Sequence, residues 1–341
     1  MISKFIDIFR SQPNAGNTSI VRSSKNPGWR LTALNAPVGK VAQALLNDPK
    51  KADAGFPPQW LAYVEKLLSL DGDMRCHAIA IFCYHIDWFN HIDPSWSEIN
   101  LLSVLNSNDT DNCDAFWDGF FWRTKTPDQK LYIRMKPNFL AIAKEKSLAK
   151  QEYSRVLAAI ILAGWGTKNK ETQERLVSDN EIRDVLVHTD DSFRCHILEI
   201  IKEWSTKEND SDYKWSGMLL PFLRDLWPRQ ISVRTPTVSA KLFALAFSNA
   251  ECFQERVEVI QLLLTPIGRN HLMLPHLKES KEKIVDLYPS ETLTLLHKVL
   301  PDNVKDWPWD IEKYIQRICE ADESLNSDER LIEIKRKWNA R

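Results

Sequence analysis

Residues 67–89 read LLSLDGDMRCHAIAIFCYHIDWF, and the landmarks of this stretch return later in the chain. The tripeptide Arg-Cys-His stands at 75–77 and again at 194–196, which is 119 residues further on. The dipeptide Trp-Ser at 96–97 returns at 215–216 with the same offset. Four pairs of single residues keep this register as well: Leu67 and Leu186, Asp71 and Asp190, Ile81 and Ile200, Leu101 and Leu220. A stretch near 61–105 therefore recurs without a gap near 180–224.

Each copy of this stretch has the pattern of three helices. A first helix ends in Leu-Leu or Leu-Val, an acidic turn follows, a second helix carries Arg-Cys-His, and a third helix opens at Trp-Ser after a loop. The offset is close to three helix pairs of the HEAT or armadillo kind, which take about 40 residues each. We therefore predict an internal duplication, in which divergent copies of one helical unit stack in a row.

The remainder of the chain has the same helical character. Apolar residues recur three and four positions apart, as in amphipathic helices, in segments that include 131–146, 152–163, 237–247, 253–264, 280–288, 291–299, 309–319 and 328–338. Only residues 230–234 resemble a strand, and weakly. We predict an all-α fold, a HEAT/armadillo-like helical repeat built as an α-solenoid or as a compact helical array. Residues 36–341 would form the repeat domain, and residues 1–35, where Ser, Asn, Pro and Gly gather, a flexible N-terminal segment.

Composition excludes several classes of function. With 45 basic and 46 acidic side chains, the chain has no global attraction to nucleic acids or anionic membranes. The six cysteines are scattered without a Cys-x-x-Cys pair, which is typical of reduced thiols in a cytosolic protein. The start lacks the apolar stretch of a signal peptide, and the longest apolar run, residues 156–166, is too short to span a bilayer. We expect a cytoplasmic location and no membrane partner.

No catalytic motif or cofactor fingerprint is present. The sequence lacks a Gly-x-Ser-x-Gly elbow as well as a Gly-rich phosphate loop, Gly-x-Gly-x-x-Gly and His-Glu-x-x-His. The glycine cluster at 164–166 is interpreted as a helix stop, with a cofactor loop as the alternative. The 10 glycines are also few for an α/β enzyme, which needs them at its turns. We therefore predict a protein that is not an enzyme and that uses no cofactor.

The two Arg-Cys-His sites allow two interpretations. Cys76-His77 and Cys195-His196 could belong to zinc sites, but structural zinc needs four closely spaced ligands, and adjacent helical residues point about 100° apart. The favoured interpretation is a packed thiol beside a hydrogen-bonded imidazole, with no metal. Arg75 would then pair with Asp71 or Asp73, and Arg194 with Asp190 or Asp191, to hold the turn between two helices.

Aromatic residues gather in three clusters. The first contains Trp117, Phe120, Phe121 and Trp122, the second Trp215, Phe222 and Trp227, and the third Trp307 and Trp309. Most of these rings would fill gaps between stacked helices. The alternative is an exposed patch that anchors a partner, a frequent role of aromatic rings at interfaces. The first cluster is the predicted partner-binding site, since four large rings in six residues exceed what one helix face can bury.

The order of the landmarks resembles that of a known family. They are Leu-Asn-Ala-Pro-Val-Gly-Lys followed by Ala-Leu-Leu (34–46), Trp-Phe and Asp-Pro-Ser-Trp (88–96), Phe-Trp-Asp-Gly-Phe-Phe (116–121), Met-Lys-Pro-Asn-Phe-Leu (135–140), Leu-Leu-Pro-Phe-Leu-Arg-Asp-Leu-Trp-Pro (219–228) and Trp-Pro-Trp (307–309). Across most of residues 30–338 the chain resembles the helical C-terminal region of bacterial anti-phage defence proteins that carry an N-terminal sirtuin-like NADase domain.

The resemblance implies a sensor function. In that family the helical region is thought to sense a phage component and to hold the effector domain inactive. The NAD-cleaving residues belong to the other domain and nothing here matches them, so no catalytic residue is carried over. The chain would be either a fragment or a stand-alone relative without the effector.

We therefore expect a non-catalytic recognition or scaffold module, the sensor or regulatory part of an anti-phage defence system. Its partner would be a phage protein or an associated defence effector. Two other classes stay open: an enzyme with a cryptic site, such as a nuclease, and a nucleic-acid-binding solenoid. Convergent carboxylates in a pocket would favour the enzyme, and a face dominated by Lys and Arg would favour nucleic acid.

Overall fold

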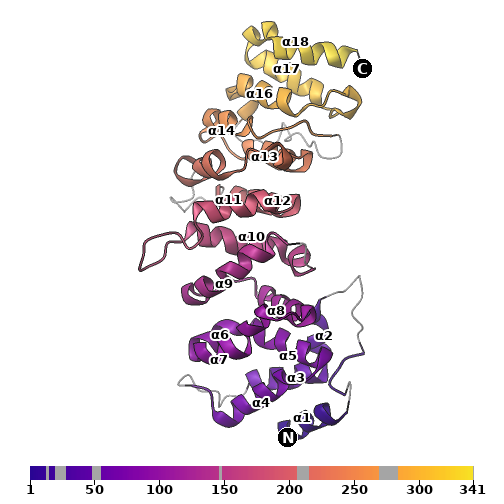
Figure 1. Cartoon of the computed structure of the whole chain (residues 1–341). Helices are drawn as coiled ribbons and strands as arrows, with labels where there is room; N and C mark the ends of the chain where they lie inside the picture. Colours follow the sequence, from indigo (N-terminus) through magenta and orange to yellow (C-terminus); the bar gives the residue numbers. More distant parts are fainter. Residues whose placement is uncertain are drawn as a thin grey trace. The chain divides into compact units, whose positions relative to one another are not determined.

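The computed structural model is helical throughout the residues that it describes, which are 1–12, 15–19, 28–47, 55–145, 148–205, 215–268 and 283–340 (Figure 1). These residues contain no β-strand, and an isolated bridge joins Lys168 to Arg175. The predicted all-α class is confirmed. Residues 230–234 do not form the weakly suggested strand, because Ile231–Val233 closes a 3₁₀ turn, η5. The chain divides into two compact units, Met1–Leu176 and Val177–Arg341.

The described part of the first unit contains ten α-helices and one 3₁₀ turn. They are α1 (Ile2–Ser11), α2 (Trp29–Asn35), α3 (Pro37–Leu46), α4 (Pro58–Leu68), α5 (Gly72–Tyr84), α6 (Ile86–Ile92), α7 (Pro94–Asn100), η1 (Leu102–Asn106), α8 (Thr110–Trp122), α9 (Gln129–Ile142) and α10 (Leu148–Gly166). α5 is buried almost all round, from Met74 to Cys83 apart from Arg75, because α2, α3, α4 and α8 all pack against it. It is the central helix of this unit.

The contact between α5 and α8 depends on one glycine. A Cβ atom on Gly119 of α8 would lie 2.2 Å from the carbonyl oxygen of Ala80 on α5. A backbone oxygen cannot move aside as the end of a flexible side chain can. Only glycine at position 119 therefore allows the two helices to pack this closely. The Asp-Gly pair of the Phe-Trp-Asp-Gly-Phe-Phe motif thus has a packing role.

Two helices lie within the segment expected to be a flexible leader. α1 buries Ile6 and Phe9, and α2 buries Trp29, which is 1% exposed. Both segments carry apolar residues at helical spacing that pack on α3, α4, α5 and α8, so their burial offsets the entropy of ordering. Residues 13–14 and 20–27 of the expected leader lie outside the described ranges.

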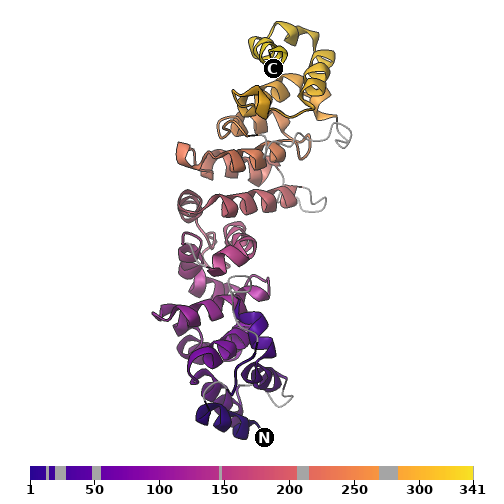
Figure 2. The same ribbon diagram turned by 90° about the vertical axis from the view of Figure 1, so that its right-hand side faces the viewer.

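The described part of the second unit continues the succession of helices. It contains α11 (Asp179–His188), α12 (Asp191–Ser205), the π-helical turns η3 (Trp215–Leu219) and η4 (Phe222–Leu226), η5, α13 (Pro236–Ala246), α14 (Phe253–Ile260), α15 (Ile284–Leu287), α16 (Pro289–Val299), η6 (Val304–Asp306), α17 (Ile311–Ala321), η7 (Glu323–Ser327) and α18 (Glu329–Asn339). Helices that follow one another in sequence also pack side by side, as α12 and α13 or α16 and α17 do (Figure 2).

Buried arginines hold several of the turns between helices. Arg194 donates from Nε to Leu186 O (2.8 Å) and from Nη2 to Val187 O (3.0 Å) in the last turn of α11. Arg256, which is fully buried, donates from Nη1 to Ala246 O at the end of α13 (3.0 Å). A cation near a helix C-terminus also suits the helix dipole. Each of these side chains therefore ties the beginning of one helix to the end of the helix before it.

The two Arg-Cys-His sites lie at equivalent places in their helices. Arg75 is the fourth residue of α5 and Arg194 the fourth residue of α12. Arg194 pairs with Asp191 at 2.8 Å, which confirms that part of the prediction. Arg75 makes no such pair in the described structure, and its Nε is buried without an acceptor. The expected pairing of Arg75 is therefore wrong: Asp71 and Asp73 line a pocket instead.

The duplication and the HEAT/armadillo character of the repeat stay predictions at this point. In both copies the first two predicted helices are present, as α4 and α5 and as α11 and α12. The third is α-helix α7 in the first copy, whereas in the second copy Trp215 opens the π-helical turn η3. Residues 206–214 of the second copy lie outside the described ranges.

Candidate functional site

Three of the four rings in the predicted partner-binding cluster lie in the core. Trp117 is 7% exposed, Phe120 1% and Phe121 0%, while Trp122 is half-buried. The expectation of an exposed patch therefore fails at these three positions. The reason is that α8 packs against α2, α5, α10 and η1, so it buries more than one face. A partner contact at Trp122 stays a prediction.

Asp118, in the middle of this cluster, has a role that the sequence did not reveal. Its side chain is 4% exposed and accepts hydrogen bonds from the backbone N–H of Arg30 and from the hydroxyl of Tyr153. Arg30 lies in the first turn of α2, whose N-cap residue is Gly28 and offers no side chain. Asp118 thus satisfies a free amide of α2 from a distant helix, as an N-cap residue would do locally.

Trp122 packs beside this buried network. The guanidinium carbon of Arg30 lies 5.8 Å from the centroid of the Trp122 ring, and the ring of Tyr84 lies 4.7 Å away. The first distance is within the range of a cation–π interaction. Trp122 therefore packs against Arg30 and Tyr84 within the fold. A partner that bound Trp122 would do so with these contacts still in place.

Trp117 also borders a surface pocket of about 390 Å³ between η1, α8 and α9. The carboxylates of Asp114 and Glu145 and the thiol of Cys113 line it as well. Burial raises the pKa of Cys113, and its Sγ donates to Val104 O at 3.2 Å. The thiol is therefore held in its protonated, weakly nucleophilic form.

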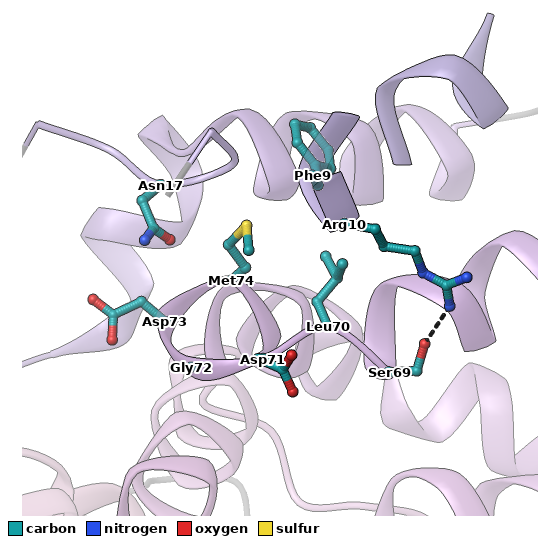
Figure 3. A pocket seen from close by; sticks show the side chains of 9 residues that line it. All are labelled: Phe9, Arg10, Asn17, Ser69, Leu70, Asp71, Gly72, Asp73 and Met74. Atoms are coloured by element: carbon teal, nitrogen blue, oxygen red, sulfur yellow. Dashed lines mark hydrogen bonds between the residues drawn. The ribbon is translucent and has the colours of Figure 1, made fainter. Parts of the chain in front are cut away.

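A second pocket, of about 480 Å³, lies beside the acidic turn before α5 (Figure 3). Phe9 and Arg10 of α1 line one side of it, and residues 69–74 line the other. Arg10 reaches across to Ser69, where Nη2 donates to Oγ at 2.8 Å. The turn requires Gly72, whose φ of +57° lies in the left-handed region. The pocket brings one guanidinium and two carboxylates together, but no nucleophile paired with a base.

The two Cys-His pairs pack among neighbouring side chains and are not grouped as metal ligands would be. His77 is 2% exposed and meets the ring of Trp29 edge-on at 5.7 Å, and His196 bonds Glu199 Oε2 through Nδ1 at 3.1 Å. Burial raises the pKa of Cys195 to about 11. Within the described ranges, no three His, Cys, Asp or Glu side chains gather in an arrangement that could hold a metal ion.

The other two aromatic clusters divide between core and surface. Trp215, Phe222 and Trp227 are at most 3% exposed, and so is Trp307. Trp309, in contrast, is 76% exposed, with Nζ of Lys313 5.1 Å from its ring centroid. A ring of this size so open to water is the feature expected of a partner anchor.

No helix of the described ranges combines the length and the apolar character that crossing a membrane requires. No family model matches the chain, and no solved structure does. A stretch of 164 residues, 47% of the chain, is 23% identical to the uncharacterized protein y4cA of Sinorhizobium fredii. That stretch corresponds to 14% of the length of y4cA, so the chain is similar to a small part of a much longer protein.

Proposed function

We propose that this chain is a helical-repeat recognition module without catalytic activity, the sensor or regulatory part of a bacterial anti-phage defence system. It would act in the cytoplasm by binding a protein partner, either a phage protein or an associated defence effector. The defence assignment rests on the landmark resemblance given above. The binding mode rests on the repeat and on its exposed side chains.

The observation that supports the repeat is a recurring sequence separation between residues joined by hydrogen bonds, found beside bonds at other separations such as Arg317–Asp286 at 31 residues. In the first unit the separation is 35 to 40 residues, for Tyr153–Asp118, Cys76–Asn112, Arg123–Asp87, Arg134–Glu98 and Gln129–Asn169. In the second unit it is 35 to 42 residues, for Lys337–Asp302, His297–Glu333, Gln254–Glu291, Lys241–Glu199 and Arg183–Asp225. Such contacts are expected when each helix pair of about 40 residues packs on the next pair.

Trp309 supports a binding role for this repeat. Burying an exposed Trp against a partner removes a large apolar surface from water, and interface energy concentrates in such residues. Lys313, on the following helix, holds a positive charge beside the ring. The site therefore offers an apolar anchor with a charged rim, the usual composition of a hot spot.

The test is capture of a partner by the tagged chain from lysates of phage-infected and uninfected bacteria, with quantitative mass spectrometry. The wild-type chain should enrich one protein reproducibly, and Trp309→Ala should weaken its binding by about thirtyfold or more, because a hot-spot residue contributes about 2 kcal/mol or more. Leu262→Ala, which removes a side chain that is 50% exposed in the same unit, is the matched control. Equal recovery of every protein by wild type and Trp309→Ala would contradict the proposed anchor.

A further inference from the structure

Four arginines of the second unit are linked by hydrogen bonds to one another or to Asp225. Arg224, Arg229 and Arg234 follow one another at intervals of five residues along η4 and η5. Nη2 of Arg229 donates to Arg224 O at 3.0 Å, and Nη2 of Arg234 donates to Arg229 O at 2.7 Å. Arg183 of α11 joins them, since its Nη2 donates to Asp225 O at 2.7 Å. We call these four residues the arginine cluster.

Three charges of the cluster, those of Arg224, Arg229 and Arg183, act on Asp225 together. Arg224 binds the Asp225 carboxylate with two parallel hydrogen bonds of 2.9 and 3.0 Å. This bond lowers the pKa of Asp225, and the charges of Arg229 and Arg183 lower it further. One carboxylate cannot balance four guanidinium groups, so the cluster carries an excess of positive charge. Like charges held together cost folding energy, which suggests that a ligand compensates them.

Backbone contacts hold these guanidinium groups in place and leave donors available. A guanidinium has five N–H donors, and within the described structure Arg229 directs one nitrogen, Nη2, to an acceptor. Its side chain is exposed, as are those of Arg183 and Arg224. Arg224 and Asp225 lie in a π-helical turn, a rare conformation that is frequent at functional sites. The cluster is therefore ordered before any ligand arrives, which reduces the entropy cost of binding.

An apolar side chain lies between two of these arginines. Ile231, between Arg229 and Arg234 in sequence, is 85% exposed. The neighbouring Trp227 is 3% exposed, so it offers no ring face to a nucleic-acid base. Single-stranded nucleic acids are usually held by aromatic stacking as well as by charge. An apolar side chain among charges fits an acidic peptide that carries an apolar residue better than it fits a chain of phosphates.

We propose that the arginine cluster binds an acidic segment of the partner protein, with Arg183, Arg229 and Arg234 on its carboxylates and Ile231 against an apolar side chain. This inference rests on the proposed function, because it names the chemistry of the partner. Arg guanidinium groups suit carboxylates because the planar fork can donate two parallel hydrogen bonds. The bond between Arg224 and Asp225 already shows that geometry.

The test is fluorescence anisotropy with the full chain and a labelled peptide of Glu-Glu-Leu repeats. A peptide with Gln in place of Glu, and a labelled oligothymidine, are the competing probes. We expect the acidic peptide to bind, and the Gln peptide at least about tenfold more weakly, because charge–charge complementarity is lost. The double variant Arg229→Glu/Arg234→Glu should weaken acidic-peptide binding by about tenfold or more for the same reason.

Matched variants distinguish the loss of this binding site from a general effect of net charge and from a loss of folding. Arg336→Glu makes the same charge change as Arg229→Glu alone, at an exposed position on α18; Arg336→Glu should leave binding unchanged, whereas Arg229→Glu should weaken it. Arg229→Lys keeps the charge but not the fork, so the loss should be intermediate. Ile231→Ser should weaken binding about threefold without changing charge, as expected for one exposed apolar contact. Circular dichroism of each variant checks that the helical signal is unchanged.

Three outcomes would overturn the proposal. They are no binding of the acidic peptide, an equal loss in Arg336→Glu, and tighter binding of oligothymidine that is lost in the double variant. The last outcome would assign the cluster to nucleic acid instead. If the double variant still captures the partner that wild type enriches from lysate, this inference fails while the proposed function stands. If Trp309→Ala captures the partner normally and the double variant loses peptide binding, the Trp309 anchor fails while this inference stands.

Discussion

Replacing Asp118 by Ala should strongly destabilise the first unit. The substitution removes a buried carboxylate that accepts two hydrogen bonds, from the Arg30 N–H and the Tyr153 hydroxyl. Hydrogen bonds to a charged group contribute about 1.5–3 kcal/mol each, and loss of an N-cap costs about 0.5–2 kcal/mol. Because the Arg30 bond is itself the cap, the two figures overlap. We expect a loss of about 3–5 kcal/mol in the free energy of unfolding.

The measurement is urea denaturation followed by circular dichroism and tryptophan fluorescence. The two units can unfold separately, so the transition that shifts is the one to analyse. Tyr153→Phe removes one donor and leaves the carboxylate bonded to Arg30, so it should cost about 1.5–3 kcal/mol. Glu145→Ala is the control, since it removes an exposed carboxylate of the same unit and should change stability by about 0.5 kcal/mol or less.

A double-mutant cycle isolates the bond between Asp118 and Tyr153. Asp118→Ala and Tyr153→Phe should be non-additive by about 1–2 kcal/mol, because both remove the same bond. The reasoning is refuted if Asp118→Ala costs about as little as Glu145→Ala, or if the two substitutions are simply additive. Either result would mean that water or another donor satisfies the carboxylate without Tyr153 and α2.

Three further predictions concern helix packing, the buried thiols and the proposed lack of catalysis. Gly119→Ala should cost about 1–3 kcal/mol because its Cβ would meet Ala80 O, whereas Gly217→Ala, with nothing within 4 Å, should be neutral or slightly stabilising in the same denaturation assay. Cys83 and Cys195 should react slowly with iodoacetamide at pH 8 until urea is added, since burial raises the pKa of both thiols. The stability that the two neutral, buried thiols contribute should be complete below the pKa of the unfolded state. It should be lost as the pH rises through the pKa of the folded state, which is about 11 for Cys195. Rapid labelling of both thiols in the folded protein would contradict this. The purified chain should neither consume NAD nor degrade DNA; turnover of either at enzymatic rates would refute the non-catalytic proposal.

Local chemistry made several features predictable. Arg194 and Asp191 are three residues apart on one helix, so their pairing follows from helix geometry alone. Gly164-Trp165-Gly166 predicts a helix stop, and α10 ends at Gly166. Asp190 accepts from the Phe193 N–H at 2.9 Å, as its place before an apolar run indicates. Each of these interactions spans a few residues and needs no knowledge of distant neighbours.

The candidate site could not be predicted in this way. The Arg-Cys-His motif places Asp71 and Asp73 close to Arg75 in sequence, yet in the structure both residues line a pocket formed with α1. The arginine cluster has no local sequence pattern, because Arg183 lies 42 residues from Asp225. The spacing of five residues between Arg224, Arg229 and Arg234 also does not indicate a shared helix face, because neighbours on one face are three or four residues apart.

The three-and-four spacing of apolar residues was enough to predict the all-α class, because it suits helices and leaves little alternation for strands; the described residues are helical and contain no strand. Tertiary structure alone decided which aromatic rings reach water. Trp117, Phe120 and Phe121 are buried because several helices surround α8, whereas Trp309 is left open. The spacing of apolar residues in the sequence indicates how many faces of a helix are apolar. The number of neighbours that cover those faces depends on contacts between residues far apart in the chain.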